Sequence, residues 1–132
     1  MNNSISGQCH CGSVKWTATL PHKIALNCHC NMCRSLSGAD YSSWIVIPSD
    51  QFSVISGGED LTEYQASAAF TKSFCKKCGS TVNCINNDKF PDHTYVAKGN
   101  ISTDFDIPAE IQVFTNFKAS WVNIDESIPV FN

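Results

Sequence analysis

Short runs in which apolar and polar residues alternate dominate this chain, and such runs predict β-strands with one buried face. Alternation is clearest over Ser13–Leu20 and again over Lys23–Cys28. Further strands are expected over Tyr41–Ile47, Phe52–Ile55, Leu61–Gln65, Phe70–Phe74, Thr81–Ile85, Thr94–Ala97 and Ile111–Phe117. Helical periodicity is weak, and Arg34–Ala39 is expected to form at most a single helical turn that Gly38 ends. The pattern predicts a mainly β domain of about ten short strands.

The expected turns carry most of the cysteines, and one turn holds three of them. Cys28, Cys30 and Cys33 fall within six residues, in the spacings C-x-C and C-x-x-C. Such spacings let a turning backbone aim several sulfurs at one point, where Zn²⁺ is the usual partner of thiolates. Three protein ligands with one open position are typical of a catalytic zinc, whereas four are typical of a structural zinc. We therefore predict that this cluster is the working site.

A second spacing, Cys75-x-x-Cys78 followed by Gly79, predicts a metal-binding turn in which glycine permits a left-handed backbone. A redox C-x-x-C motif usually opens a helix in a βαβ unit, but a strand is expected next here, which favours metal. Cys9 and Cys11 form the third group. The spacing alone leaves open whether they complete a four-cysteine site with Cys75 and Cys78 or join the three-cysteine cluster.

Four other residues near these motifs have simpler interpretations. His10 and His29 each stand between two cysteines, where an extended backbone points the middle side chain away from the thiols, so neither is expected to bind the metal. Cys84 lies in an apolar strand and is expected to be a buried, inert thiol. Arg34 follows Cys33 directly, and is either an exposed charge or a cation that anchors an anionic substrate beside the zinc.

Composition and charge limit the class of protein and the kinds of partner that this chain can have. The 132 residues, 42% of them hydrophobic, are enough for one domain, taken as residues 1–132. A net charge of −3 argues against a nucleic-acid partner. The sequence lacks an apolar stretch of membrane-spanning length and a recognisable signal peptide, so a cytoplasmic protein is expected. In a reducing compartment, eight cysteines of which seven lie in close groups indicate metal rather than disulfides.

Taken together, these motifs resemble the glutathione-dependent formaldehyde-activating enzyme family, which also includes centromere protein V. The resemblance runs from about Gly7 to Phe131. The matching residues are Gly7-x-Cys9-x-Cys11-Gly12-x-Val14, Cys28-His29-Cys30-x-x-Cys33-Arg34 with Ser37-Gly38, Phe74-Cys75-x-x-Cys78-Gly79-Ser80, Lys118-Ala119-Ser120-Trp121 and Ile128-Pro129.

The resemblance implies an Mss4-like, mainly β fold of short antiparallel strands with zinc-binding turns and two zinc ions per chain. It assigns a structural zinc to the set Cys9, Cys11, Cys75 and Cys78. It assigns a catalytic zinc to Cys28, Cys30 and Cys33. Family members often have a histidine where this chain has Gln112. The activity that names the family joins glutathione to formaldehyde to give S-hydroxymethylglutathione and is classed as a carbon–sulfur lyase.

Two functions follow from this sequence. The first is a zinc-dependent carbon–sulfur lyase that joins a small thiol such as glutathione to an aldehyde such as formaldehyde, with Arg34 as the candidate substrate anchor. The second is a non-catalytic two-zinc interaction module or metal-dependent chaperone, in which a fourth protein ligand closes the three-cysteine site. A zinc-ribbon nucleic-acid binder conflicts with the charge, and the oligomeric state is left open.

Overall fold

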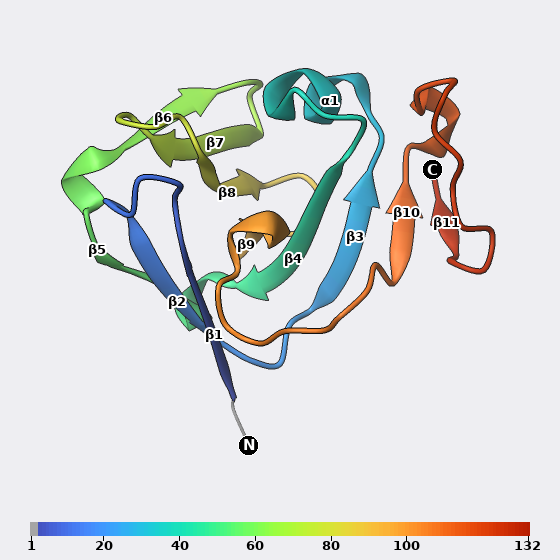
Figure 1. Ribbon diagram of the computed structural model, residues 1–132. Coiled ribbons are helices and arrows are strands. Elements are labelled where there is room, and N and C mark those ends of the chain that lie inside the picture. The colour runs from blue at the N-terminus through green and yellow to red at the C-terminus, as the bar shows by residue number, and fades with distance from the viewer. Residues whose placement is uncertain (1–2) are drawn as a thin grey trace.

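The structure is a computed structural model that describes residues 3–132, in which eleven strands form two sheets and one short α-helix connects two neighbouring strands of the larger sheet (Figure 1). The strands are β1 (Ser4–Gln8), β2 (Lys15–Thr19), β3 (Ile24–Cys28), β4 (Ser42–Pro48), β5 (Phe52–Ser56), β6 (Leu61–Gln65), β7 (Phe70–Cys75), β8 (Thr81–Asn86), β9 (His93–Ala97), β10 (Ile111–Val113) and β11 (Val130–Phe131). The helix is α1 (Asn31–Ser37). The 3-10 turns are Ser49–Gln51, Gly58–Asp60, Lys98–Asn100 and Thr115–Phe117.

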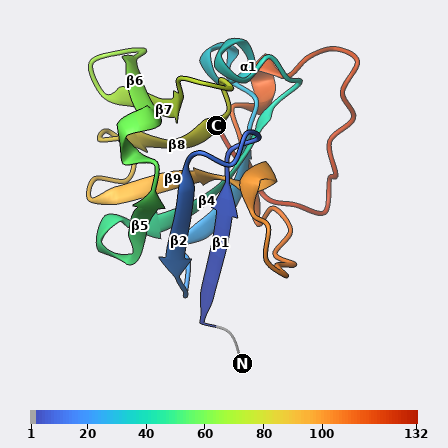
Figure 2. The ribbon, with the colours of Figure 1, turned by 60° about the vertical axis from the view of Figure 1, so that its left-hand side comes forward.

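The smaller sheet has the order β1-β2-β5 and the larger has the order β11-β10-β3-β4-β9-β8-β7-β6. Neighbouring strands are antiparallel, except that β10 runs parallel to both β3 and β11. The turned view places β1 and β2 across the strands β4 and β9 of the larger sheet (Figure 2). The mainly β prediction is confirmed, and the parallel pairing of β10 is a feature that the expectation of antiparallel strands missed.

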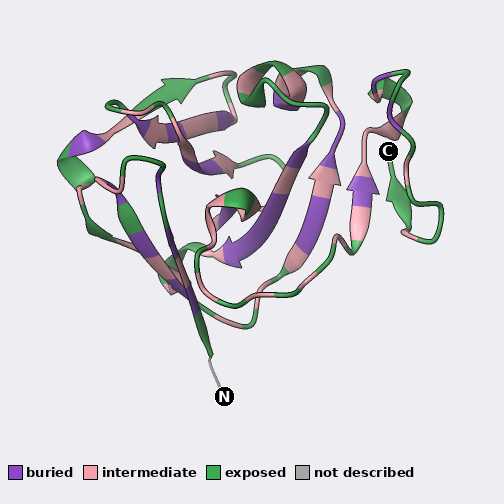
Figure 3. Cartoon of the chain, viewed as in Figure 1, coloured by how far each residue is buried: buried purple, intermediate pink, exposed green. Residues whose placement is uncertain are grey.

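Strand β4 lies at the centre of the larger sheet and has both faces buried. Ile45 and Ile47 belong to the core cluster that also contains Trp16 and Ala18 of β2. On the opposite face, Trp44 and Val46 belong to a second cluster together with Cys28, Cys33 and Tyr95. Figure 3 shows β4 buried along most of its length, whereas the edge strands β6 and β11 are exposed. Each core cluster contains two closely spaced thiols: Cys9 and Cys75 in the first, and Cys28 and Cys33 in the second.

Three differences from the predicted elements have local physical causes. The strand expected over Ile111–Phe117 ends at Val113, because Phe114 adopts a left-handed backbone with φ 56° and begins a 3-10 turn. The helix begins three residues before the predicted turn, at Asn31, and Gly38 ends it with φ 60°, as predicted. Strands β1 and β11 were not predicted, because short edge segments such as Ser4–Gln8 carry little periodic signal.

The helices of the described residues are all short. The longest, α1, has seven residues, whereas a membrane-spanning helix needs about 20. None of the described helices therefore has the length and hydropathy to cross a bilayer.

Candidate metal centres

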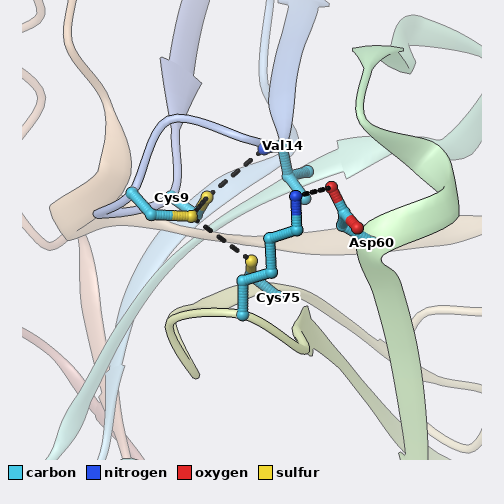
Figure 4. Close-up of polar contacts among 6 residues, drawn as sticks. Cys9, Val14, Asp60 and Cys75 are labelled. Carbon is cyan, nitrogen blue, oxygen red and sulfur yellow. Dashed lines mark hydrogen bonds and ion pairs between the residues drawn. The ribbon is translucent and has the colours of Figure 1, made fainter.

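The structure gathers four sulfurs at one end of the smaller sheet, which we call the four-cysteine cluster. Their Sγ atoms all lie within 4.8 Å of one another, and they come from Cys9, Cys11, Cys75 and Cys78. The Cys9–Cys11 and Cys11–Cys75 sulfur distances are 3.6 and 3.7 Å (Figure 4). Two thiolates on a tetrahedral zinc with bonds of about 2.3 Å lie about 3.8 Å apart. The sulfurs therefore have the spacing that a bound zinc needs.

Two tight turns position these sulfurs. In the turn between β1 and β2, the Gly12 N–H donates to the Cys9 carbonyl at 3.0 Å. In the turn between β7 and β8, the Gly79 N–H donates to the Cys75 carbonyl at 2.7 Å. Both glycines have φ 80°, a left-handed conformation that costs other residues free energy. The left-handed backbone predicted at Gly79 is confirmed.

Polar contacts hold the four-cysteine cluster to the strands around it. The Val14 N–H donates to Cys9 Sγ at 3.3 Å, which suits a sulfur that carries negative charge. Lys77 Nζ lies 3.3 Å from the largely buried Asp60 carboxylate. A dashed line at the labelled Asp60 in Figure 4 marks this ion pair. The hydrogen bond with Asp60 raises the pKa of Lys77. This ion pair ties the β7–β8 turn to the 3-10 turn before β6.

A second group, the three-cysteine cluster, forms where β3 ends and α1 begins. The Sγ atoms of Cys28, Cys30 and Cys33 lie within 4.8 Å of one another, and Cys28 and Cys30 are 3.5 Å apart. Cys30 is the N-cap of α1, and its sulfur accepts a hydrogen bond from the Cys33 N–H at 3.3 Å. Helix capping therefore builds this cluster, because an N-cap side chain and the third helical residue are brought together by the first turn.

Hydrogen bonds among these three thiols shift their pKa values in opposite directions. Hydrogen bonds from Cys28 and Cys33 lower the pKa of Cys30. The same network raises the pKa of Cys33, through its contacts with Cys28 and then Cys30. A metal that takes all three sulfurs must displace the protons of the thiols whose pKa is raised, Cys28 and Cys33.

The two clusters are separate, so the structure does not add Cys9 and Cys11 to the three-cysteine cluster, an arrangement that spacing alone had left open. All eight cysteines are free thiols. The eighth, Cys84, is 1% exposed in the second core cluster, and burial raises its pKa to about 12. Cys84 is buried as predicted.

His29 lies beside the three-cysteine cluster, and neither of its ring nitrogens joins the sulfurs among the described residues. Its ring is 1% exposed and packs on Tyr41 with centroids 4.9 Å apart. His29 Nε2 donates to Gln112 Oε1 at 3.0 Å, and Gln112 Nε2 donates to the Asp125 carbonyl at 3.2 Å. Sequence reasoning placed His29 outside the ligand set but did not identify Gln112 as its partner. His10, by contrast, is exposed.

An apolar cavity of about 430 Å³ opens beside the three-cysteine cluster. Its lining consists of Leu26, Cys28, Cys30, Met32, Cys33, Trp44, Phe70, Asn86, Lys89, Phe90, Tyr95, Ile111, Val113, Phe114, Phe131 and Asn132. Lys89 is the one charged side chain in that lining. Burial raises the pKa of the Tyr95 hydroxyl, so this group stays protonated at neutral pH. The sequence motifs give no sign of this cavity, because its walls come from seven strands, from α1 and from the loops between them.

Arg34 does not line this cavity. Its Nη1 donates to the Phe117 carbonyl at 3.2 Å, and its guanidinium lies 5.6 Å from the centre of the Trp121 ring. Trp121 Nε1 in turn donates to Asp40 Oδ1 at 2.9 Å. Arg34, Trp121 and Asp40 line an open polar hollow that also borders α1. The structure thus separates the candidate anchor from the cavity that the thiols face.

Fold and site together define a mainly β protein with two thiol clusters that are each able to hold a metal ion. The chain belongs to the glutathione-dependent formaldehyde-activating enzyme family, because the family profile with that description matches residues 4–117. That span includes every cysteine of both clusters.

Individual relatives agree with this membership. A protein from Halomonas elongata, named only provisionally as a glutathione-dependent formaldehyde-activating enzyme, is 26% identical over 92% of this chain and 81% of its own length. A Phaeosphaeria nodorum protein with the same name is 40% identical over 54% of this chain and 38% of its own length. The crystal structure of a Rhodobacter sphaeroides protein superposes with a TM-score of 0.65 and 24% identity, over 76% of this chain and 90% of that one. The last likeness supports the fold alone.

Proposed function

We propose that this protein is a zinc-dependent enzyme of the carbon–sulfur lyase type, which joins a small thiol such as glutathione to an aldehyde such as formaldehyde. Cys28, Cys30 and Cys33 would hold the catalytic zinc, and the four-cysteine cluster would hold a structural zinc. Family membership supports the reaction class, and the spacing of the sulfurs supports the metal.

One observation carries the proposal: three sulfurs converge at the edge of a cavity, and no fourth histidine, cysteine or carboxylate ligand joins them among residues 3–132. A zinc with three protein ligands is typical of catalysis. A zinc held there would supply a Lewis acid that lowers the pKa of a coordinated thiol.

The chain's own residues would bring the reactants together. The cavity walls exclude water and hold the aldehyde close to the thiol, which provides the gain in rate that comes from proximity. In the reaction, the thiol sulfur bonds to the carbonyl carbon, the carbon–oxygen π bond breaks, and the thiol proton ends on the oxygen. Arg34 remains a candidate for holding a carboxylate of the thiol at the neighbouring polar hollow.

The alternative, a non-catalytic interaction module, expects a fourth protein ligand that closes the three-cysteine site. The described residues place no such ligand there, so the structure favours the enzyme.

The test is the rate at which zinc-loaded protein forms S-hydroxymethylglutathione from glutathione and formaldehyde, measured above the uncatalysed rate. Wild type should accelerate the reaction, and Cys30→Ala should lose the acceleration. Cys84→Ala is the matched control, since it removes a cysteine outside both clusters and should retain activity. Equal rates for wild type and Cys30→Ala would contradict the proposal.

A further inference from the structure

The cavity beside the three-cysteine cluster is poorly matched to formaldehyde. Its volume is about 430 Å³, within the range of pockets that enclose drug-sized molecules. A one-carbon aldehyde would leave most of this space unfilled and most of the wall without a contact. The volume of the cavity therefore fits a reactant larger than formaldehyde.

The walls define the chemistry of that body. Trp44 and Phe90 each meet Tyr95 edge-on, with ring centroids 6.1 and 6.0 Å apart, so three aromatic rings form a connected wall. Phe70 and Phe114 add further rings to the lining. Aromatic walls of this kind favour a second aromatic ring or a branched alkyl group, by burial of apolar area and by edge-to-face contacts.

The cavity is equally ill suited to the body of glutathione. Glutathione carries two carboxylates and an ammonium group, whereas Lys89 is the one charged side chain of the lining. Burying unpaired charges against aromatic walls is costly. The polar hollow that contains Arg34 and Asp40 also borders α1. Asn31, Arg34 and Ser35 line the hollow, whereas Met32 and Cys33 line the cavity.

We propose that the cavity binds an aromatic or branched aliphatic group carried by one of the two reactants, so that the enzyme prefers apolar substrates to formaldehyde and a wholly polar thiol. This inference rests on the proposed function for its chemistry, in that the group belongs to an aldehyde or to a thiol. Its binding to the cavity can be measured without turnover.

The thiol arm of the test uses calorimetric titration of zinc-loaded protein. Benzyl mercaptan should bind at least about tenfold more tightly than 2-mercaptoethanol, since burying a ring is worth that much. The aldehyde arm compares kcat/KM for phenylacetaldehyde and acetaldehyde with glutathione as the thiol. Preference in the thiol arm, the aldehyde arm or both supports the inference and identifies which reactant carries the group.

Two variants test whether the preference for aryl groups arises in the lining of the cavity. Phe114→Asn replaces a ring of the lining by a residue that tolerates the left-handed backbone found there, and it should remove most of the aryl preference. Phe117→Asn is the matched control: its exposed ring lies 6.5 Å from that of Phe114 but outside the lining, so the preference should stay. If Phe114→Asn does not fold, Val113→Thr serves instead, because it adds a hydroxyl to the lining without changing its shape.

The outcomes separate this inference from the proposed function. Turnover of glutathione and formaldehyde without an aryl preference in either arm overturns the inference and leaves the function standing. Tight aryl binding that Phe114→Asn abolishes, without any thiol–aldehyde turnover, supports the cavity's specificity and overturns the function. A preference that Phe117→Asn reduces as much as Phe114→Asn does would place the ring outside the cavity and overturn the inference.

Discussion

The two thiol clusters are built in opposite ways. The four-cysteine cluster joins two turns more than 60 positions apart in the chain, and so links the smaller sheet to β7 and β8 of the larger one. The three-cysteine cluster lies within one six-residue segment and links only the end of β3 to the start of α1. A metal in the first would close a long loop, whereas a metal in the second would close a very short one. We therefore expect a metal in the first cluster to hold the fold together, and the second cluster to gain or lose a metal with the fold intact.

The largest expected effect is the loss of a sulfur from the four-cysteine cluster. Cys75→Ala should unfold the domain or lower its melting temperature greatly, because a structural zinc contributes on the order of 10 kcal/mol to folding in small zinc peptides. Thermal unfolding by circular dichroism, with and without chelator, measures the effect. A melting curve that matches that of Cys84→Ala would contradict the structural role.

A smaller effect on stability is expected from Cys30→Ala. This variant should remain folded and lose one of two zinc ions per chain, together with thiol binding. Elemental analysis of protein purified without chelator, combined with titration calorimetry using glutathione, tests it. If Cys30→Ala melts as early as Cys75→Ala, the division between a fold-holding cluster and a working cluster is wrong.

The ion pair of Asp60 and Lys77 provides a finer test of the same division. Asp60→Asn should destabilise the protein by about 1 kcal/mol, because the pair is partly exposed but Asp60 itself is largely buried. Thiol binding at the three-cysteine cluster should not change. Urea unfolding of Asp60→Asn, Lys77→Gln and the double variant isolates the pair, and a zero coupling free energy would show that the contact does not support the turn.

The smallest effect concerns Glu110, near the end of β3 that is remote from Cys28. Glu110 accepts hydrogen bonds from His22 Nε2 at 2.6 Å and from the Ala25 N–H at 2.9 Å, and the His22 contact lowers its pKa. A carboxylate with a lowered pKa stabilises the fold above its ordinary pKa of 4.5 and loses that contribution as the pH falls through the lowered value.

Glu110→Gln should therefore reduce stability by less than about 1 kcal/mol near neutral pH, since the carboxylate is half exposed. The difference from wild type should disappear in acid. Unfolding measured from pH 5 to pH 3 tests the sign, and a difference that grows as the pH falls over this range would contradict the assigned cause.

The sequence alone determined the fold class and the location of the thiols. The alternation of apolar and polar residues that predicted strands is found in β2, where Trp16 and Ala18 are fully buried. Residues two apart in a strand lie on the same face, so the alternation indicates which face packs on the core. Gly38 and Gly79 were predictable as left-handed turn residues for the same local reason. The single-domain extent and the cytoplasmic location remain predictions from composition.

Only the tertiary structure decided how distant residues meet. Residue spacing left open which cysteines lie beside Cys75, and the structure groups it with Cys9, Cys11 and Cys78, the set that the family resemblance implied. The contact of Gln112 with His29 likewise depends on the register of strands far apart in the chain. The cavity also depends on strand register, since its walls combine α1 with β3, β4, β7, β8, β9, β10 and β11. A sequence carries the periodicity of each strand but not the order in which strands pair, because that order is set by the packing of the whole core.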